Sequence, residues 1–160
     1  RGDLATAEKE LREVKRILAD PALAKIYVST LNRADQILGI AERMLTADIA
    51  ARRKDYAAAI AALADAVQME DSLGYQEPED WHYPVRLPLG QVLLDAGRPV
   101  AAEAAFRADL KKHPENGWAL FGLEKALRAQ GKAADADAAQ RRFETAWQHA
   151  DIKLTAAVIR

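Results

Sequence analysis

Apolar residues recur at intervals of three and four along most of the chain, which is the spacing of an amphipathic α-helix. No segment shows the alternating β-branched pattern that is typical of strands. The pattern predicts helices over residues 4–19, 32–53, 55–69, 84–96, 99–112, 116–130 and 133–148. Residues 22–28 are predicted to form no more than a short helical turn. The sequence therefore indicates an all-α protein.

Proline and glycine residues mark the ends of several of these helices. Asp20-Pro21 ends the first helix, because a proline ring disfavours the α conformation of the residue before it. Gly97 and Gly131 are predicted to end two later helices in the left-handed conformation. Pro99 suits the first position of the helix that follows it.

One stretch, residues 72–84, is unlike its surroundings. It contains two prolines, a glycine and the aromatic residues Tyr75, Trp81 and Tyr83. Such a composition predicts an ordered loop that has aromatic side chains to bury. The tail from Ala150 is ambiguous, and residues 151–160 fit either a helix that caps the end of the structure or an extended segment that lies in a groove of the same chain.

Composition and charge exclude several classes of function. The chain has 160 residues, 23 Lys and Arg, 24 Asp and Glu, and no cysteine. Disulfides and thiolate metal ligands are therefore excluded, and the balanced charge argues against nucleic-acid binding. No apolar run approaches the ~18 residues of a membrane helix. The chain begins at Arg1 without an initiator Met, so we expect it to be a fragment of a longer chain.

The later helices repeat with a period of 34 residues, which points to an array of similar units. Four pairs of identical residues stand 34 positions apart: Leu89 and Leu123, Leu93 and Leu127, Gly97 and Gly131, and Ala102 and Ala136. Each unit consists of a helix, a turn that contains glycine, and a second helix. Small residues such as Ala102 would allow two helix axes to approach closely, and the large Phe106 would fill the next layer.

These residues resemble the tetratricopeptide repeat (TPR) family. Residues 83–116 carry the pattern most fully, with Leu89-Gly90 in the first helix, Ala102 and Phe106 in the second, and Pro114 at the close. The next unit departs at Gln140, where Phe143 is expected to fill the space, and Lys54 replaces the turn glycine of an earlier unit. The units are 1–31 (partial), 32–73, 83–116, 117–150 and a tail at 151–160, about three and a half repeats in a single domain. The chain also resembles the C-terminal part of longer bacterial TPR proteins of unassigned function.

The resemblance implies a right-handed superhelical solenoid of antiparallel helix pairs, with the first helix of each pair lining a concave groove. The candidate partner-binding residues in this groove are Leu87, Gln91, Leu94, Trp118, Phe121, Lys125 and Arg128. Aromatic and arginine side chains often supply binding energy at interfaces, and the two cations favour a peptide with an acidic feature. Alternatively, Trp118 and Phe121 pack against the tail or a neighbouring helix.

The loop at 77–84 offers a second candidate surface. Glu77, Glu79, Asp80 and His82 are possible ligands of a divalent metal, although no second histidine or known ligand spacing supports this. The structural alternative is an acidic loop whose Trp81 and Tyr83 dock on the helices. A third possibility is that Trp81 and Tyr83 contact a partner.

Taken together, these patterns predict a scaffold that binds a protein or peptide, without enzymatic activity, metal or cofactor. One alternative is a structural cap of a larger multi-repeat protein. The other is a metal-binding or hydrolytic protein that uses the loop at 77–82.

Overall fold

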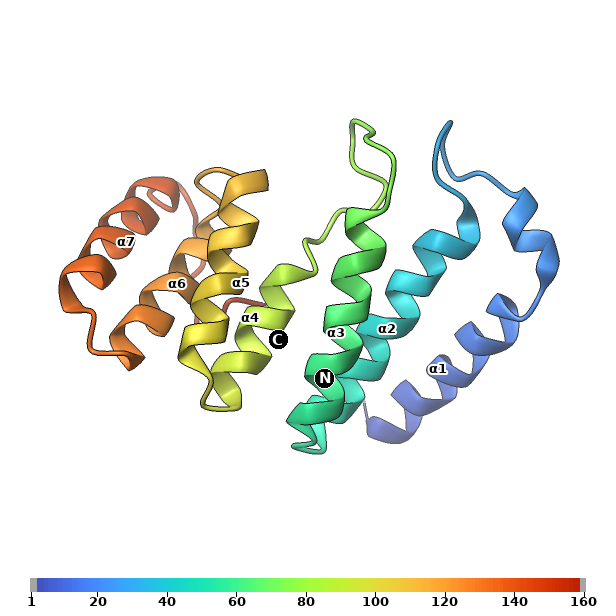
Figure 1. Cartoon of the computed structure of the whole chain (residues 1–160), viewed down its shortest axis with the longest axis horizontal. Coiled ribbons are helices and arrows are strands. Elements are labelled where there is room, and N and C mark those ends of the chain that lie inside the picture. Colours follow the sequence, from blue (N-terminus) through green and yellow to red (C-terminus); the bar gives the residue numbers. More distant parts are fainter. Residues whose placement is uncertain (1–2, 159–160) are drawn as a thin grey trace. The chain divides into compact units, whose positions relative to one another are not determined.

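The fold is all-α, as predicted. The computed structural model describes residues 3–158, and this part of the chain contains seven α-helices (Figure 1). The helices are α1 (Leu4–Leu18), α2 (Ala34–Arg52), α3 (Tyr56–Asp71), α4 (Arg86–Asp95), α5 (Pro99–Lys112), α6 (Gly117–Ala129) and α7 (Ala133–Ala146), with a 3-10 turn η1 (Pro21–Lys25) after α1. None of the described helices is long and apolar enough to cross a bilayer.

The predicted helices are confirmed to within two residues at every end. The helix predicted to start at residue 84 begins at Arg86, and the backbone N–H of Val85, just before it, donates to Oε1 of Glu70 at 3.0 Å. The helix predicted to reach residue 148 ends at Ala146. The chain divides into two compact units, unit 1 (Arg1–Val85) and unit 2 (Arg86–Arg160), and each is described by itself.

In unit 1, α2 packs between α1 and α3. Its core includes Ile40 of α2 and the α3 residues Ala59 and Leu63. Glu42 is also buried, and its carboxylate accepts a hydrogen bond from Thr46 Oγ1 at 3.1 Å and lies 3.4 Å from Lys15 Nζ of α1. These partners compensate the cost of removing the carboxylate from water.

Three helices end in the same kind of turn. After α4, Gly97 has φ 69° and its N–H donates to Leu94, while Arg98 N–H donates to the Leu93 carbonyl at 2.8 Å. This pair of bonds is the Schellman motif, which satisfies carbonyl groups at a helix end. Equivalent bonds close the turns at Gly131 after α6 and at Lys54 after α2. The prediction of left-handed glycine caps is confirmed, and Lys54 adopts the same conformation with φ 62° despite its side chain.

The core of unit 2 is built around the ring of Phe106, which is fully buried on α5. A Cβ atom added to Gly90 of α4 would lie 2.4 Å from this ring, and one added to Gly122 of α6 would lie 2.2 Å from it. The two glycines therefore form the slot that holds the ring. Ala102 and Ala136 are also fully buried, which confirms the prediction that small residues stand where helices touch.

A buried carboxylate joins the end of α5 to the start of α6. Both oxygens of Asp109 have partners, since Oδ1 lies 3.0 Å from His113 Nδ1 and Oδ2 accepts from Asn116 Nδ2 at 2.9 Å. Burial raises the pKa of Asp109, and its contact with His113 opposes that shift. Asn116 also caps α6 through the Trp118 N–H, so this cluster fixes the connection between the two helices.

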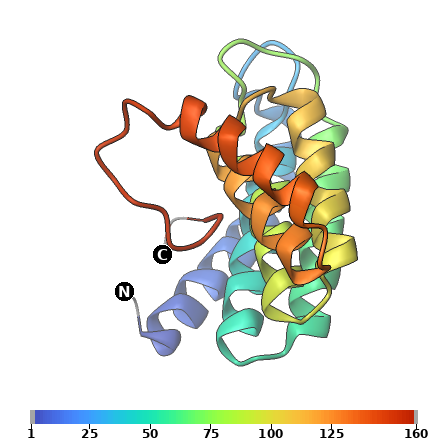
Figure 2. The same cartoon turned by 90° about the vertical axis from the view of Figure 1, so that its left-hand side faces the viewer.

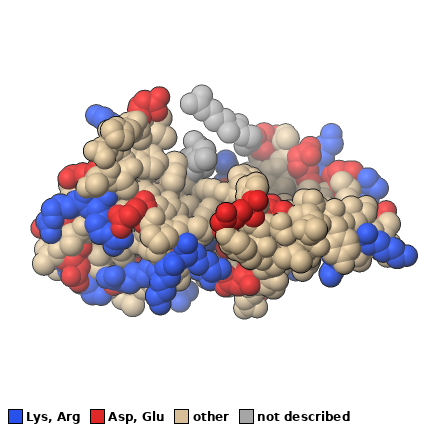
Figure 3. All heavy atoms as spheres, turned by 90° about the horizontal axis from the view of Figure 1, so that it is seen from above, with Lys and Arg blue, Asp and Glu red and all other residues tan. Residues whose placement is uncertain are grey.

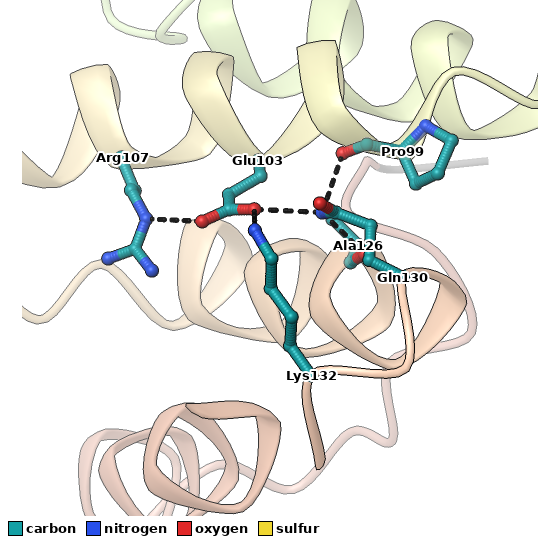
Figure 4. A network of polar contacts seen from close by, with 6 residues as sticks. All are labelled: Pro99, Glu103, Arg107, Ala126, Gln130 and Lys132. Carbon is teal, nitrogen blue, oxygen red and sulfur yellow. Dashed lines mark hydrogen bonds and ion pairs between the residues drawn. The ribbon is translucent and has the colours of Figure 1, made fainter. Parts of the chain in front are cut away.

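A second polar network ties α5 to the α6–α7 turn (Figure 4). The carboxylate of Glu103 accepts hydrogen bonds from Lys132 Nζ at 2.8 Å, Gln130 Nε2 at 2.8 Å and Arg107 Nε at 2.9 Å. The Glu103 side chain is only 13% exposed. Chiefly because of the Lys132 bond, the pKa of Glu103 falls from 4.5 to about 2.

We expect Glu103→Gln to lower the free energy of unfolding by about 1–2 kcal/mol near neutral pH, a value reduced for solvent screening of the half-exposed cations. Because the folded pKa is depressed, this stability is fully present above pH 4.5 and is lost as the pH falls through about 2. Urea unfolding at a series of pH values should show the wild type and the variant converging in acid. The exposed Glu144→Gln on α7 is the control, and a constant difference at every pH would contradict the assignment.

Candidate functional site

The C-terminal tail lies against α4 of its own unit. Residues 151–158 form no helix, so the alternative of a capping helix is wrong for this described part of the tail. The segment leaves α7 and turns back towards the helices, as the red trace in Figure 2 shows. Ala156 and Ala157 are buried at its end. The tail therefore occupies part of the surface for which a binding role was predicted.

Gln91 of α4 holds the tail through a backbone hydrogen bond. The N–H of Ala157 donates to Oε1 of Gln91 at 2.8 Å. The amide group of Gln91 is oriented in turn, since its Nε2 donates to Asp95 Oδ1 one helical turn later at 2.8 Å. At the other end of the segment, Trp147 Nε1 donates to the Ile152 carbonyl at 2.9 Å. Two of these bonds, at Ala157 and at Ile152, are made by backbone groups of the tail, which suits recognition of an extended chain.

The two predicted aromatic anchors of α6 pack against α7. The rings of Trp118 and Trp147 meet edge to face with centroids 5.5 Å apart, and Phe121 lies 5.6 Å from Phe143. Gly117 makes room for this cluster, because a Cβ there would lie 2.3 Å from the Trp147 ring. Both anchors are half-buried. The contacts match the alternative in which these rings pack on a neighbouring helix, and Phe143 also stacks on Trp147.

The two predicted cations are engaged by groups of the same chain. Arg128 donates to Glu124, to Asp137 Oδ1 at 3.0 Å and to Gln140 Oε1 at 2.8 Å. These carboxylates raise the pKa of Arg128, with Glu124 as the main cause. Lys125 Nζ stands 5.3 Å from the centroid of the Phe121 ring and 3.4 Å from Glu124. An acidic ligand would have to compete with these internal partners.

A pocket of about 240 Å³ lies between α6 and α7 next to these cations. Its lining combines the rings of Phe121 and Phe143 with the charged groups of Glu124, Lys125 and Glu144. Lys125 is the exposed cation at its edge. The pocket is lined by residues of α6 and α7, whereas the tail contacts Gln91 of α4.

The predicted groove residues Leu87 and Leu94 are on α4, apart from the aromatic and cationic residues of α6. Leu94 is half-buried on α4, while Leu87 is fully packed in the core at 2% exposure, so the prediction that Leu87 lines a groove is wrong. Leu87 is buried because α4 packs against both α5 and α6, so that its buried positions spread around much of the helix.

Trp81 and Tyr83 belong to unit 1, where both are half-buried in the loop between α3 and α4. In the same loop Asp80 accepts hydrogen bonds from Ser29 and Asn32, so its carboxylate has a structural role. Among residues 3–158, no group of three His, Asp or Glu side chains is arranged to hold a metal ion.

The sequence left open an extended tail that lies in the groove, but it did not predict the contact between Gln91 and Ala157. Ala156 and Ala157 are small and unremarkable in the sequence, and the periodicity of the tail fits a helix as well as an extended segment. The interval between Gln91 and Ala157 is 66 residues, so no local pattern connects them. Comparison of the chain with models of known families, with curated proteins and with solved structures found no match.

Proposed function

We propose that this chain is a protein-interaction scaffold of the tetratricopeptide type, in which the surface of α4 around Gln91 binds an extended peptide. The observation that carries the proposal is the hydrogen bond from the Ala157 N–H to Gln91, together with the burial of Ala156 and Ala157. The contact of the tail with Gln91 supports the idea that this surface accepts an extended chain. In the free protein the tail is the internal competitor of the partner.

Features of unit 2 support the tetratricopeptide assignment. Gly97 and Gly131, 34 residues apart, have φ values of 69° and 73° and the same Schellman bonds. Ala102 and Ala136, also 34 apart, are both fully buried where helices meet. Helix α4 also contacts α6, the first helix of the next pair. In a right-handed solenoid such first helices would line one continuous concave surface.

The tail also indicates the chemistry of the partner. Two consecutive alanines are buried, so the partner should carry small side chains at these positions. Gln91 Oε1 accepts from a backbone N–H, which excludes proline at the position of Ala157. Main-chain hydrogen bonds give affinity in extended peptide recognition, while the fit of side chains gives specificity.

A truncated chain ending at residue 149 tests the proposal. We expect it to bind a fluorescent peptide with the sequence of residues 150–158, measured by anisotropy. The full-length chain should bind the same peptide at least about tenfold more weakly, because its own tail competes at an effective concentration on the order of millimolar. A peptide with Ala157→Pro is the matched control, and it should lose binding.

Gln91→Leu in the truncated chain removes the acceptor, so we expect it to weaken binding of the peptide while circular dichroism stays unchanged. If the chain is instead only a structural cap of a larger repeat protein, we expect truncation of the tail to abolish the cooperative unfolding of unit 2. Loss of cooperative unfolding after truncation would overturn the scaffold proposal for this surface. A truncated chain that folds but does not bind the peptide would also overturn it.

A further inference from the structure

Unit 1 exposes a cluster of large apolar side chains on two neighbouring loops. Ile26, Tyr27, Val28 and Leu31 are between 51% and 58% exposed, and Tyr75 is 75% exposed. We call these five residues the hairpin patch. Five of the seven large apolar side chains that are exposed in the described chain belong to it. Single exposed apolar residues are common, whereas a gathered set marks a surface for interaction.

The backbone of the patch has an open edge. Residues 26–34 form a small hairpin, in which Val28 N–H donates to Asn32 at 3.0 Å and Ala34 N–H donates to Ile26 at 2.8 Å. Tyr27 pairs with Arg33 between these two bonds. In an antiparallel pair, the N–H and C=O of a residue at such a position point away from the partner strand. The backbone groups of Tyr27 are therefore directed outwards, where another strand can pair with them.

Buried polar contacts keep the patch in place. Asn32 is 2% exposed, and its Nδ2 donates to Gly74 O at 2.8 Å and to Asp80 Oδ2 at 2.7 Å. Its Oδ1 accepts from Gly74 N–H at 2.7 Å, and Ser29 Oγ donates to Asp80 Oδ2 at 2.6 Å. Gly74 packs so closely on Leu31 that a Cβ there would lie 2.9 Å from it. This network joins the two loops that carry the hairpin patch.

The charged residues near the hairpin patch indicate the charge of the partner that it binds. Glu77, Glu79 and Asp80 lie within four positions of one loop, and the hydrogen bonds to Asp80 lower the pKa of that carboxyl so that it stays ionised. Arg33, a nearby cation, is paired with Asp35 at 2.9 Å. Figure 3 looks onto these loops, and there an uncharged area adjoins acidic side chains. A basic partner is therefore favoured over a second copy of this chain, an anionic membrane or a nucleic acid.

We propose that the hairpin patch docks a basic, apolar peptide segment of a protein partner, which adds as a strand to the open edge at Tyr27. The apolar side chains of the segment cover the patch, and its Lys or Arg side chains face the carboxylates of the 77–80 loop. This mode of recognition combines main-chain bonds with side-chain contacts. It uses unit 1 alone, so it stands independently of the tail contact in unit 2.

The test uses the full chain and two labelled heptapeptides, one alternating lysine with valine and the other alternating glutamate with valine. We expect the lysine peptide to bind by fluorescence anisotropy at low salt, and to bind at least about tenfold more tightly than the glutamate peptide. Raising the salt concentration should weaken this binding, because the charges are exposed.

The double substitution Tyr27→Ser with Tyr75→Ser should reduce binding of the lysine peptide about tenfold or more, with circular dichroism unchanged because both rings are exposed. Val100→Ser, an equally exposed apolar position on α5, is the control and should bind as the wild type does. Equal binding of the two peptides, or binding that survives the double substitution, would overturn the proposal. Self-association that depends on Tyr27 and Tyr75 would also overturn it, in favour of a second copy.

Discussion

Phe106→Ala should lower the free energy of unfolding of unit 2 by about 3–5 kcal/mol, the usual cost of deleting a large aromatic side chain from a core. The ring is fully buried and lies against helices on both sides, so its neighbours are poorly placed to collapse into the space. Because native domains are stable by only about 5–15 kcal/mol, this change removes a large share of the total. Urea unfolding, followed by circular dichroism and by the fluorescence of Trp118 and Trp147, measures it.

Val100→Ala provides the matched control on the same helix. Val100 is 68% exposed on α5, and surface substitutions of this kind change stability by no more than about 0.5 kcal/mol. A loss of less than about 1 kcal/mol for Phe106→Ala would show that the ring does not anchor the packing of α4, α5 and α6. The proposed binding surface on α4 would then lack its structural support.

Gly122→Ala should be destabilising by about 2–3 kcal/mol, although alanine is the better helix former, because an added methyl group overpacks the core. The new Cβ would meet the tip of the Phe106 ring at 2.2 Å. The ring cannot withdraw towards α4, since the glycine there is already in close contact with it. The shift in the midpoint of urea unfolding, multiplied by an unchanged m-value, gives this loss of stability.

A double-mutant cycle separates this clash from other effects of the glycine. In the Phe106→Ala background the slot is empty, so Gly122→Ala should cost little or should stabilise the helix by up to about 1 kcal/mol. Gly97→Ala is the contrasting substitution, since its cost comes from a φ of 69° and is independent of Phe106. If Gly122→Ala is equally costly with and without the Phe106 ring, the steric explanation fails.

The two proposed binding surfaces are held in place by different interactions. In unit 2 a rigid helix presents one oriented amide, Gln91, to the backbone of an extended chain. In unit 1 a buried asparagine, Asn32, holds two loops together so that apolar side chains remain in water. Each unit therefore offers its own candidate surface, and each surface can be disabled without disturbing the core of the other unit.

The helices could be predicted from local signals in the sequence. Apolar spacing, Asp20-Pro21 and the glycines at 97 and 131 placed the helix ends within two residues, and the resemblance to a repeat pattern implied that Ala102, Phe106 and Ala136 are buried. Which side chains meet across long intervals of sequence became clear only from the folded structure. It paired Arg128 with Asp137, bonded Gln91 to Ala157, and joined Asn32 to Asp80. These contacts depend on how helices pack and on where loops return, and local periodicity carries no information about either.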